Sequence, residues 1–370
     1  MQFRFSDEHE ELRRGLRRLL EGSGGPASEP DEPLDDSLIK RLVDELGVYA
    51  LAVPEDRGGA GFGFVELGVV FHEAGRALLR APLLSTTLAT VLLTDQAVGS
   101  AADRELVASV AAGALSAAAA IHDPTAVTAT TSRSGPDGGG DAGRWELTGT
   151  ADWVLDGASA QLLVVAATTP SGPALFTVEP EGSGVAVERV TTTDPSRRVA
   201  TIHLERCAAR MVVEDAAAAL DRARSIALVL LAAEQTGIAE ACLEVAADWA
   251  RQREQFGRPI GSFQAIKHKL ADVRLELEAA LSASMYALWA ADSSPAELPV
   301  AARIAAVTCG EAAVRSAQEN IQVHGGIGAT WEHPAHLYLR RALLDRLLFG
   351  DTQSHLAELA NEVDRIAEGV

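Results

Sequence analysis

The sequence predicts an α+β fold with an N-terminal α-helical domain, a middle β-barrel or β-sandwich domain and a C-terminal four-helix bundle. Three observations support this prediction. Apolar residues recur at helical spacing towards both ends of the chain, short strand-like alternations replace them in the middle, and Ala and Leu, which favour helix, are abundant. The changes of pattern place the domains at residues 1–118, 119–212 and 213–370.

The first domain has the pattern of several helices joined through a glycine-rich loop. Ser6 precedes an acidic turn, so it can cap a helix whose dipole favours negative charge at its start. Two stretches rich in Leu, Val and Ala, Leu38–Leu46 and Val65–Leu79, continue the helical pattern. Between them, Val53–Gly61 holds one proline and three glycines and predicts a loop.

The middle domain is predicted from short segments rich in Thr, Val and Gly. The expected strands are Trp145–Gly149, Leu162–Ala167, Ala174–Val178, Val185–Val190 and Ala200–Leu204. Their roughly regular spacing is typical of a small barrel or sandwich. Gly135–Asp141 is rich in glycine and is expected to form an exposed turn.

The last domain shows four long helical segments with short links, which predicts a four-helix bundle. Apolar residues recur at three- and four-residue steps between Ile226 and Trp249, and again between Ile266 and Leu281. Pro299 stands where a third helix can start, since its missing N–H costs little there. A fourth helix is expected from Pro334 to Glu368.

Charge and composition exclude several classes of function. The chain has 370 residues and a formal net charge of −20, which disfavours binding to nucleic acid and to anionic membranes. The three cysteines are widely spaced without a C-x-x-C pair, and a His-x-x-His pair at His333 has no third ligand beside it, so no metal site is expected. A charged N-terminus and the lack of an uncharged 18-residue apolar run predict a cytoplasmic protein that spans no membrane.

The link between the first two bundle helices is the first candidate binding segment. It runs from Arg251 to Gln264 and combines backbone fixed by glycine and proline with Arg253 and the amide of Gln264. A guanidinium makes charge-assisted bonds to phosphate oxygens, so this corner can present Arg253 to a phosphate-bearing ligand. The alternative is an ordinary helix–helix turn with solvated charges.

The second candidate segment is Gln322–Gly328, between the third and fourth bundle helices. Its consecutive glycines allow backbone to approach a ligand closely, and exposed N–H groups can hold an anion. The alternative is a glycine stop at the end of a helix.

Together, in this order and on this architecture, the segments resemble the acyl-CoA dehydrogenase family over nearly the whole chain. In the first two domains the resemblance lies in Asp44–Gly47, Val53–Glu55, Gly58–Gly61, Trp145–Gly149 and Asp194–Arg198. In the bundle it lies in Gly237, Arg253, Phe256–Gly257, Phe263–Gln264, Ala271–Asp272, Gln322, Gly325–Gly326 and Gly328.

The resemblance implies an FAD enzyme that oxidises an acyl-CoA to the 2,3-enoyl-CoA and passes electrons to an electron-transfer flavoprotein. The family binds FAD at a subunit interface, where the two bundle segments contact the pyrophosphate and adenosine of a neighbouring subunit's cofactor. Carried over by motif, the FAD contacts donated in trans are Arg253, Phe256, Gln264, Gln322, Gly325 and Gly326.

The sequence departs from the family in the segment that holds the flavin ring and the thioester. Family members carry a Thr-Glu-Pro-x-x-Gly-Ser-Asp type segment there. This chain has Ile121–Ala129 in that place, where Pro124 and, for the acid, Asp123 match and the Gly-Ser-Asp part is absent.

The catalytic base is the second departure. Removal of the α-proton requires a carboxylate within hydrogen-bond reach. Counting from Gly325 puts the family's base position at Phe349, and the other family position, on the first bundle helix, holds Ala227. Three carboxylates remain as weak substitutes: Asp351, Glu234 and Asp221. Glu234 is better explained as a paired structural carboxylate on an apolar helix, and Asp221 as part of a surface charge cluster.

The pattern of kept and lost residues predicts the base-lacking partner in a hetero-oligomer. Residues that reach a neighbour's FAD are present, and those that build this chain's own flavin site are degraded. Some bacterial members of the family, notably those that act on steroid side chains, form α2β2 complexes of two different subunits. One alternative is a self-sufficient homo-oligomer with an unusual base, and another is a pseudoenzyme that binds acyl-CoA or a partner protein. The acyl group is not encoded in a linear motif.

Overall fold

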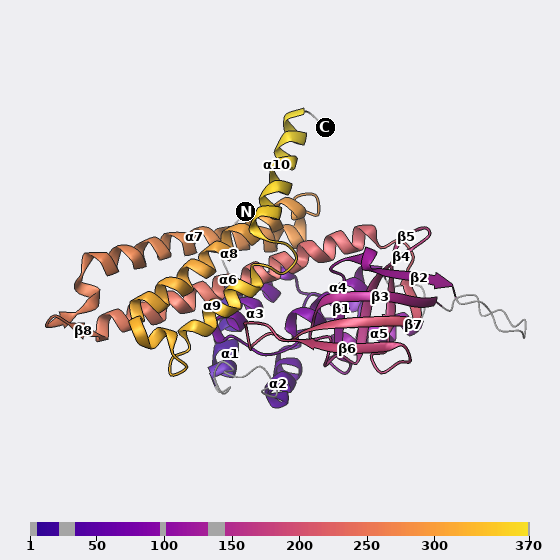
Figure 1. Cartoon of the computed structure of the whole chain (residues 1–370), viewed down its shortest axis with the longest axis horizontal. Coiled ribbons are helices and arrows are strands. Elements are labelled where there is room, and N and C mark those ends of the chain that lie inside the picture. The colour runs from indigo at the N-terminus through magenta and orange to yellow at the C-terminus, as the bar shows by residue number, and fades with distance from the viewer. Residues whose placement is uncertain (1–5, 22–33, 97–100, 132–144, 369–370) are drawn as a thin grey trace, which may run out of the picture.

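The computed structural model describes residues 6–21, 34–96, 101–131 and 145–368. The turn expected at Gly135–Asp141 lies outside the described residues. The helical bundle forms most of the length of the molecule, the strands gather at one end of it, and the first helices lie along one side (Figure 1). This arrangement confirms the expected fold class of helices, then strands, then a helical bundle.

The N-terminal part is helical, as expected. Its helices are α1 (Asp7–Glu21), α2 (Asp36–Leu46), α3 (Phe64–Ala77), α4 (Leu83–Gln96) and α5 (Ala101–Ala111). The Ser6 hydroxyl accepts a hydrogen bond from the His9 N–H at 3.4 Å, so Ser6 caps α1. The Asp35 side chain caps α2 by accepting from two backbone N–H groups, and Gly47 ends that helix in the left-handed conformation.

The strands form a closed barrel, which decides between the two expected architectures. They are β1 (Ala117–Ala120), β2 (Val127–Thr131), β3 (Trp145–Leu155), β4 (Leu162–Thr169), β5 (Gly172–Val178), β6 (Val185–Val190) and β7 (Val199–Val213). Pairing runs β4–β2–β3–β7–β5 and returns to β4, which closes the ring. Strand β1 adds to β4 in parallel, and β6 adds to β7. The division at residues 118 and 212 stays a prediction.

Two strands of the barrel were not predicted from the sequence. Strand β1 consists of four alanines, and intrinsic propensity favours helix for alanine. It is a strand because Ala117–Ala120 pair with Leu162–Val165 of β4, and tertiary pairing overrides propensity. Strand β2, Val127–Thr131, falls in the segment whose family pattern is lost.

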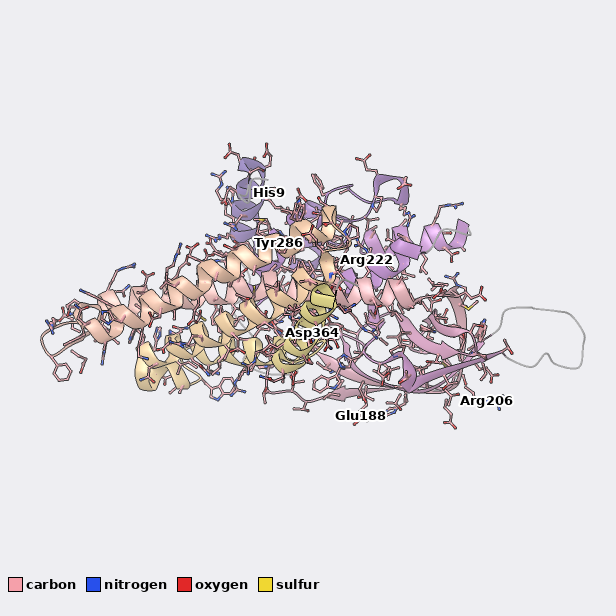
Figure 2. All side chains as sticks on the ribbon, turned by 90° about the horizontal axis from the view of Figure 1, so that it is seen from above. His9, Glu188, Arg206, Arg222, Tyr286 and Asp364 are labelled. Atoms are coloured by element: carbon pink, nitrogen blue, oxygen red, sulfur yellow. The ribbon has the colours of Figure 1, made fainter. Side chains whose placement is uncertain are left out.

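The bundle contains α6 (Ala217–Gln252), α7 (Gln264–Ser293), α8 (Leu298–His324) and α9 (Ala335–Asp345). Pro299 is the second residue of α8, as predicted. The expected single helix from Pro334 to Glu368 is wrong, because the chain breaks after α9 and continues as α10 (Thr352–Glu368). At the break, Phe349 and Gly350 have positive φ angles of 62° and 122°, which no α-helix accommodates. Helix α10 projects away from the bundle (Figure 1), and Figure 2, where Asp364 marks it, looks along its axis.

Helix α6 is the central element of the molecule. It is long and apolar enough to cross a membrane by composition, but 89% of its apolar window is buried inside the protein, as in the core helix of a globular fold. Helix α3 crosses it closely at two glycines. A Cβ on Gly75 would lie 2.0 Å from the Glu234 carbonyl oxygen, and a Cβ on Gly237 would lie 1.9 Å from that of His72. These glycines therefore hold the N-terminal helices against the bundle.

Candidate functional site

The link between α6 and α7 forms a small β-hairpin. Strands β8 (Glu254–Gln255) and β9 (Arg258–Pro259) pair, and the turn residues Phe256 and Gly257 have φ angles of 56° and 74°. Two positive φ values define a type I′ turn, which suits glycine but strains a bulky residue. Phe256 is nevertheless 92% exposed. Phe256 therefore combines a strained backbone with an exposed aromatic ring at the tip of the hairpin. This combination indicates a residue that contacts a ligand or another chain.

Contacts with the Phe263 ring hold the hairpin in place. The Arg258 guanidinium lies 4.1 Å from the Phe263 ring centroid, and the Phe256 ring meets the same ring edge-on at 6.1 Å. Arg253 is the first residue after α6; its guanidinium lies 6.0 Å from the Trp249 ring, and its side chain is exposed. Gln264 begins α7 and is also exposed.

The segment Gln322–Gly328 ends α8 beside this hairpin. Gln322, Gly325 and Gly326 are exposed, and a Cβ on either glycine would meet nothing within 4 Å, so space for a ligand is open there. His324 stacks on Trp249 with 4.9 Å between ring centroids. Because this stack joins the end of α8 to the end of α6, the structure brings together the two segments that the sequence singled out.

These residues lie far from the barrel of the same chain. Helix α6 starts next to the end of β7 and has 36 residues, which corresponds to ~54 Å at 1.5 Å per residue. Figure 1 shows β8 at one end of the molecule and the barrel towards the other. The open glycine backbone, the exposed Arg253 and the aromatic ring of Phe256 fit the phosphate and adenosine half of FAD. A cofactor bound there is therefore too far away to reach this chain's own barrel.

Phe349, at the counted base position, lies where the bundle meets the barrel domain. Its backbone is left-handed, with φ of 62°, a conformation rare for a bulky residue. The ring packs against two of the apolar clusters of the chain, and its centroid is 6.1 Å from that of His122. His122 belongs to the segment that replaces the family's flavin-holding motif. The two departures from the family pattern are thus neighbours in space.

Glu234 is a structural carboxylate bound by two arginines. Its Oε2 accepts from Arg197 Nη2 at 2.8 Å, and its Oε1 lies 3.2 Å from Arg341 Nη1. The side chain is 4% exposed. Because each carboxylate oxygen already faces a guanidinium, Glu234 is poorly suited to take a proton from a substrate.

These three residues belong to a buried ion cluster with Asp194 and Asp345. Arg197 Nε donates to Asp345 Oδ1 at 2.6 Å, and Arg341 Nε lies 3.3 Å from Asp194 Oδ2. Arg341 also donates to the Ser196 hydroxyl and the Leu79 carbonyl oxygen. The cluster joins the β6–β7 connection to α6 and α9, so it fixes the barrel domain against the bundle.

Sequence reasoning missed this cluster. Arg341 is 2% exposed and donates to groups of its own chain, so its guanidinium is not available to a coenzyme A phosphate or to another subunit. Its neighbour Arg340 donates to the Thr193 carbonyl oxygen at 3.0 Å. The sequence held one sign of this cluster: Glu234 is an acid on an otherwise apolar helix. A buried charge needs a partner of opposite charge, so its position predicts an ion pair.

Replacing Asp345 with Asn is expected to flatten the dependence of stability on pH. Burial, opposed by Arg197 and reinforced by Glu234, raises the pKa of Asp345 to about 7. The unfolded chain releases this proton near the ordinary aspartate pKa of about 3.9. The free energy of unfolding of the unaltered protein should therefore fall as pH rises from about 4 through about 7. Urea midpoints across this range should diverge between the two proteins, and parallel curves would contradict the assignment.

Asp351 is also committed to a structural contact. It precedes α10 and accepts a hydrogen bond from the Ser354 N–H at 2.8 Å, which makes it a helix cap rather than a helix residue. The backbone and hydroxyl of Ser354 lower the pKa of Asp351. The third carboxylate, Asp221, is exposed, and its Oδ1 lies 3.5 Å from Arg224 Nη1, so it belongs to a surface ion pair. A carboxylate held at low pKa by a cap is a weak proton acceptor.

The described residues contain no group of three or more His, Cys, Asp or Glu side chains placed to hold a metal ion. The three cysteines are buried free thiols. Burial raises the pKa of Cys242 and of Cys309, so neither resembles a reactive thiolate.

Comparison with known proteins gives consistent matches over nearly all of the chain. Residues 6–113 match the acyl-CoA dehydrogenase N-terminal domain, and residues 227–363 match the acyl-CoA dehydrogenase C-terminal domain. Acyl-CoA dehydrogenase IpdE2 of Mycobacterium tuberculosis is 35% identical over 367 residues, which cover 96% of this chain and 98% of that protein.

Two solved structures with high similarity are complexes named for two different proteins. The Tcur3481-Tcur3483 steroid ACAD, in a variant form, superposes with a TM-score of 0.85 at 30% identity and covers 98% of both chains. The ChsE4-ChsE5 complex from Mycobacterium tuberculosis gives a TM-score of 0.86 at 27% identity, covering 98% of this chain and 99% of the other.

Proposed function

Because the chain belongs to the acyl-CoA dehydrogenase family, we propose that it is the base-lacking subunit of a hetero-oligomer that oxidises an acyl-CoA thioester to the 2,3-enoyl-CoA. FAD supplies the hydride acceptor for this reaction. The second subunit, itself acyl-CoA dehydrogenase-like, provides the carboxylate that removes the α-proton and the barrel that holds the flavin ring. Electrons then pass to an electron-transfer flavoprotein, and the complex works in the cytoplasm.

The observation that carries this proposal is the side chain at the base position. Phe349 has no group that accepts a proton, and its strained backbone places the ring against His122, where the family's flavin-holding segment is replaced. The nearest substitutes offered by the sequence are unsuitable, because Glu234 is bound by two arginines and Asp351 caps α10. This chain therefore needs another chain to complete the chemistry.

The bundle end supports a role in holding FAD in trans. Arg253, Phe256 and Gln264 from the hairpin side and Gln322, Gly325 and Gly326 from the end of α8 are exposed. We assign to Arg253 the charge-assisted bonds to the pyrophosphate, and to the two glycines a close backbone approach. This end is remote from the chain's own barrel, and we therefore assign the cofactor that it contacts to the partner subunit.

The substrate class follows from the relatives rather than from the site. One similar structure is named a steroid ACAD, and a bulky thioester from fatty acid or steroid β-oxidation is the substrate we propose. Both similar complexes carry the names of two proteins, in agreement with a hetero-oligomer.

Co-expression tests the proposal. The chain is produced alone and with an acyl-CoA dehydrogenase-like chain encoded in the same genome, and the flavin absorbance of each purified preparation is recorded. We expect flavin and acyl-CoA oxidation only after co-expression. Yellow, active protein from the chain alone would indicate a self-sufficient enzyme with Asp351 or Glu234 as base. Lack of flavin in both preparations would favour a pseudoenzyme that binds acyl-CoA or a partner without redox chemistry.

A further inference from the structure

Helix α10 carries an apolar stripe that no other described part of the chain covers. The helix is held on α8 at its start, where the Thr352 hydroxyl donates to Glu311 Oε1 at 3.1 Å, and His355 is buried. Beyond His355 the helix projects from the bundle (Figure 1), and no described side chain from Leu356 to Arg365 is buried. This free part is ~15 Å long at 1.5 Å per residue.

The apolar residues of the free part share one face of the helix. Leu356 and Val363 are 44% and 64% exposed, and Leu359 between them is half-buried. At 3.6 residues per turn the three side chains lie within about 60° around the helix axis. Their spacing of three and four residues is the pattern by which one helix packs against another. We call Leu356, Leu359 and Val363 the α10 stripe.

An uncovered stripe needs a physical reason, because short helices gain most of their stability from packing. Isolated helices shorter than about 12–15 residues are marginal in water, even with favourable sequences. Exposed apolar residues that are scattered singly are ordinary, whereas these form a row on an element that projects into solvent. The stripe therefore indicates a partner that packs on α10.

The charges beside the stripe indicate the kind of partner. Helix α10 has four carboxylates and one guanidinium, and that guanidinium, of Arg365, is paired with Glu362. Glu358 and Asp364 flank the stripe on opposite sides, and neither forms an ion pair within the described part of the chain. Two such helices placed together would repel each other, so a second copy of this chain is disfavoured as the occupant. A helix with an apolar face bordered by Lys or Arg complements both features.

We propose that the α10 stripe packs on a helix of the unlike subunit whose apolar face is bordered by Lys or Arg, and that the carboxylates of α10 select that subunit over a second copy of this chain. The inference rests on the proposed function, since it requires a second subunit. It adds a physical reason for pairing between unlike chains. Figure 1 shows α10 well away from β8, so substitutions on α10 leave the proposed FAD contacts of the hairpin in place.

A single substitution on the stripe tests the contact. Val363→Asp places a carboxylate on the apolar face, and Val363 is exposed, so the fold of the chain is kept. In mass photometry of the diluted co-expressed complex, we expect the dissociation constant of the unlike pair to rise by roughly tenfold or more. Asn361→Asp is the matched control, since it adds the same charge to the opposite face of α10 and should change the constant less than about twofold. Equal constants for the two variants would overturn the assignment of α10.

A double variant tests the charges. Glu358→Gln with Asp364→Asn keeps the shape of both side chains and removes their charges. We expect this variant to weaken the unlike pair about tenfold and to flatten its dependence on NaCl, because salt screens the attraction between opposite charges. An unchanged dependence on salt would show that α10 does not meet basic residues. Self-association of the lone chain that tightens in the double variant would identify a second copy as the occupant and would also overturn the proposal.

Hydrogen exchange separates a failure of this inference from a failure of the proposed function. Amide exchange in residues 356–365 should be slower in the complex than in the chain purified alone, because the partner covers α10. A flavin-containing complex in which these amides exchange as fast as in the lone chain would overturn only the assignment of α10. If co-expression with the unaltered chain gives no complex, the proposed function and this inference both fail.

Discussion

Replacing Arg253 with Ala is expected to weaken FAD binding by the co-expressed complex about ten- to a hundredfold. Arg253 is exposed at the end of α6, next to the open backbone of Gly325 and Gly326. Loss of a hydrogen bond to a charged group costs about 1.5–3 kcal/mol, which corresponds to that range of affinity. Titration of the flavin-depleted complex with FAD, followed by flavin fluorescence, measures the change.

Arg251→Ala is the matched control for this variant. Arg251 lies two residues earlier, is exposed and forms an ion pair with Asp248 on the same helix. The Arg251→Ala substitution removes one positive charge from the same end of α6, as Arg253→Ala does, but it removes no proposed FAD contact. We expect its FAD affinity to stay within about twofold of the unaltered complex. Equal losses in the two variants would indicate a general effect of charge rather than a contact from Arg253.

Replacing Arg341 with Ala is expected to lower the free energy of unfolding by about 3–5 kcal/mol, the cost of removing one partner from a buried ion pair. The side chain is 2% exposed and faces Glu234, Asp194 and the Ser196 hydroxyl. Its removal leaves two buried carboxylates with one guanidinium fewer. The change in urea midpoint, with the slope of the transition checked for a single cooperative step, gives the magnitude.

Arg315→Ala provides the comparison for Arg341. Arg315 lies half-exposed on α8, with Glu276 and Glu319 both 3.8 Å away. Exposed ion pairs contribute about 0–1 kcal/mol, so this variant should be nearly as stable as the unaltered protein. A loss for Arg341→Ala no larger than that for Arg315→Ala would show that the buried cluster contributes specificity of packing rather than stability.

The sequence predicted most of the fold because helices and strands follow from the spacing of apolar residues. It missed β1, since four alanines carry no strand signal until Leu162–Val165 pair with them. It also extended the last helix through residues 346–351, because a left-handed Phe349 leaves no mark in the composition. Both errors arise where tertiary contacts override local preference.

In the candidate site, too, local features were predicted from the sequence, whereas contacts between distant residues were not. The hairpin and the glycine segment were identified because glycine at fixed positions reports backbone geometry directly. The nearness of Phe349 and His122, and the ion cluster around Glu234, involve residues more than a hundred positions apart. No local pattern encodes such contacts, and only the general cost of an unpaired buried charge pointed to Glu234.

The central claim, that this chain serves a FAD completed by another chain, is tested most directly by counting flavins. The co-expressed complex is purified, its two chains are quantified, and the FAD released on denaturation is measured by absorbance. Our account predicts one FAD for each pair of unlike chains, and none in the chain purified alone. One FAD per chain, or a stoichiometric FAD in the lone chain, would contradict it.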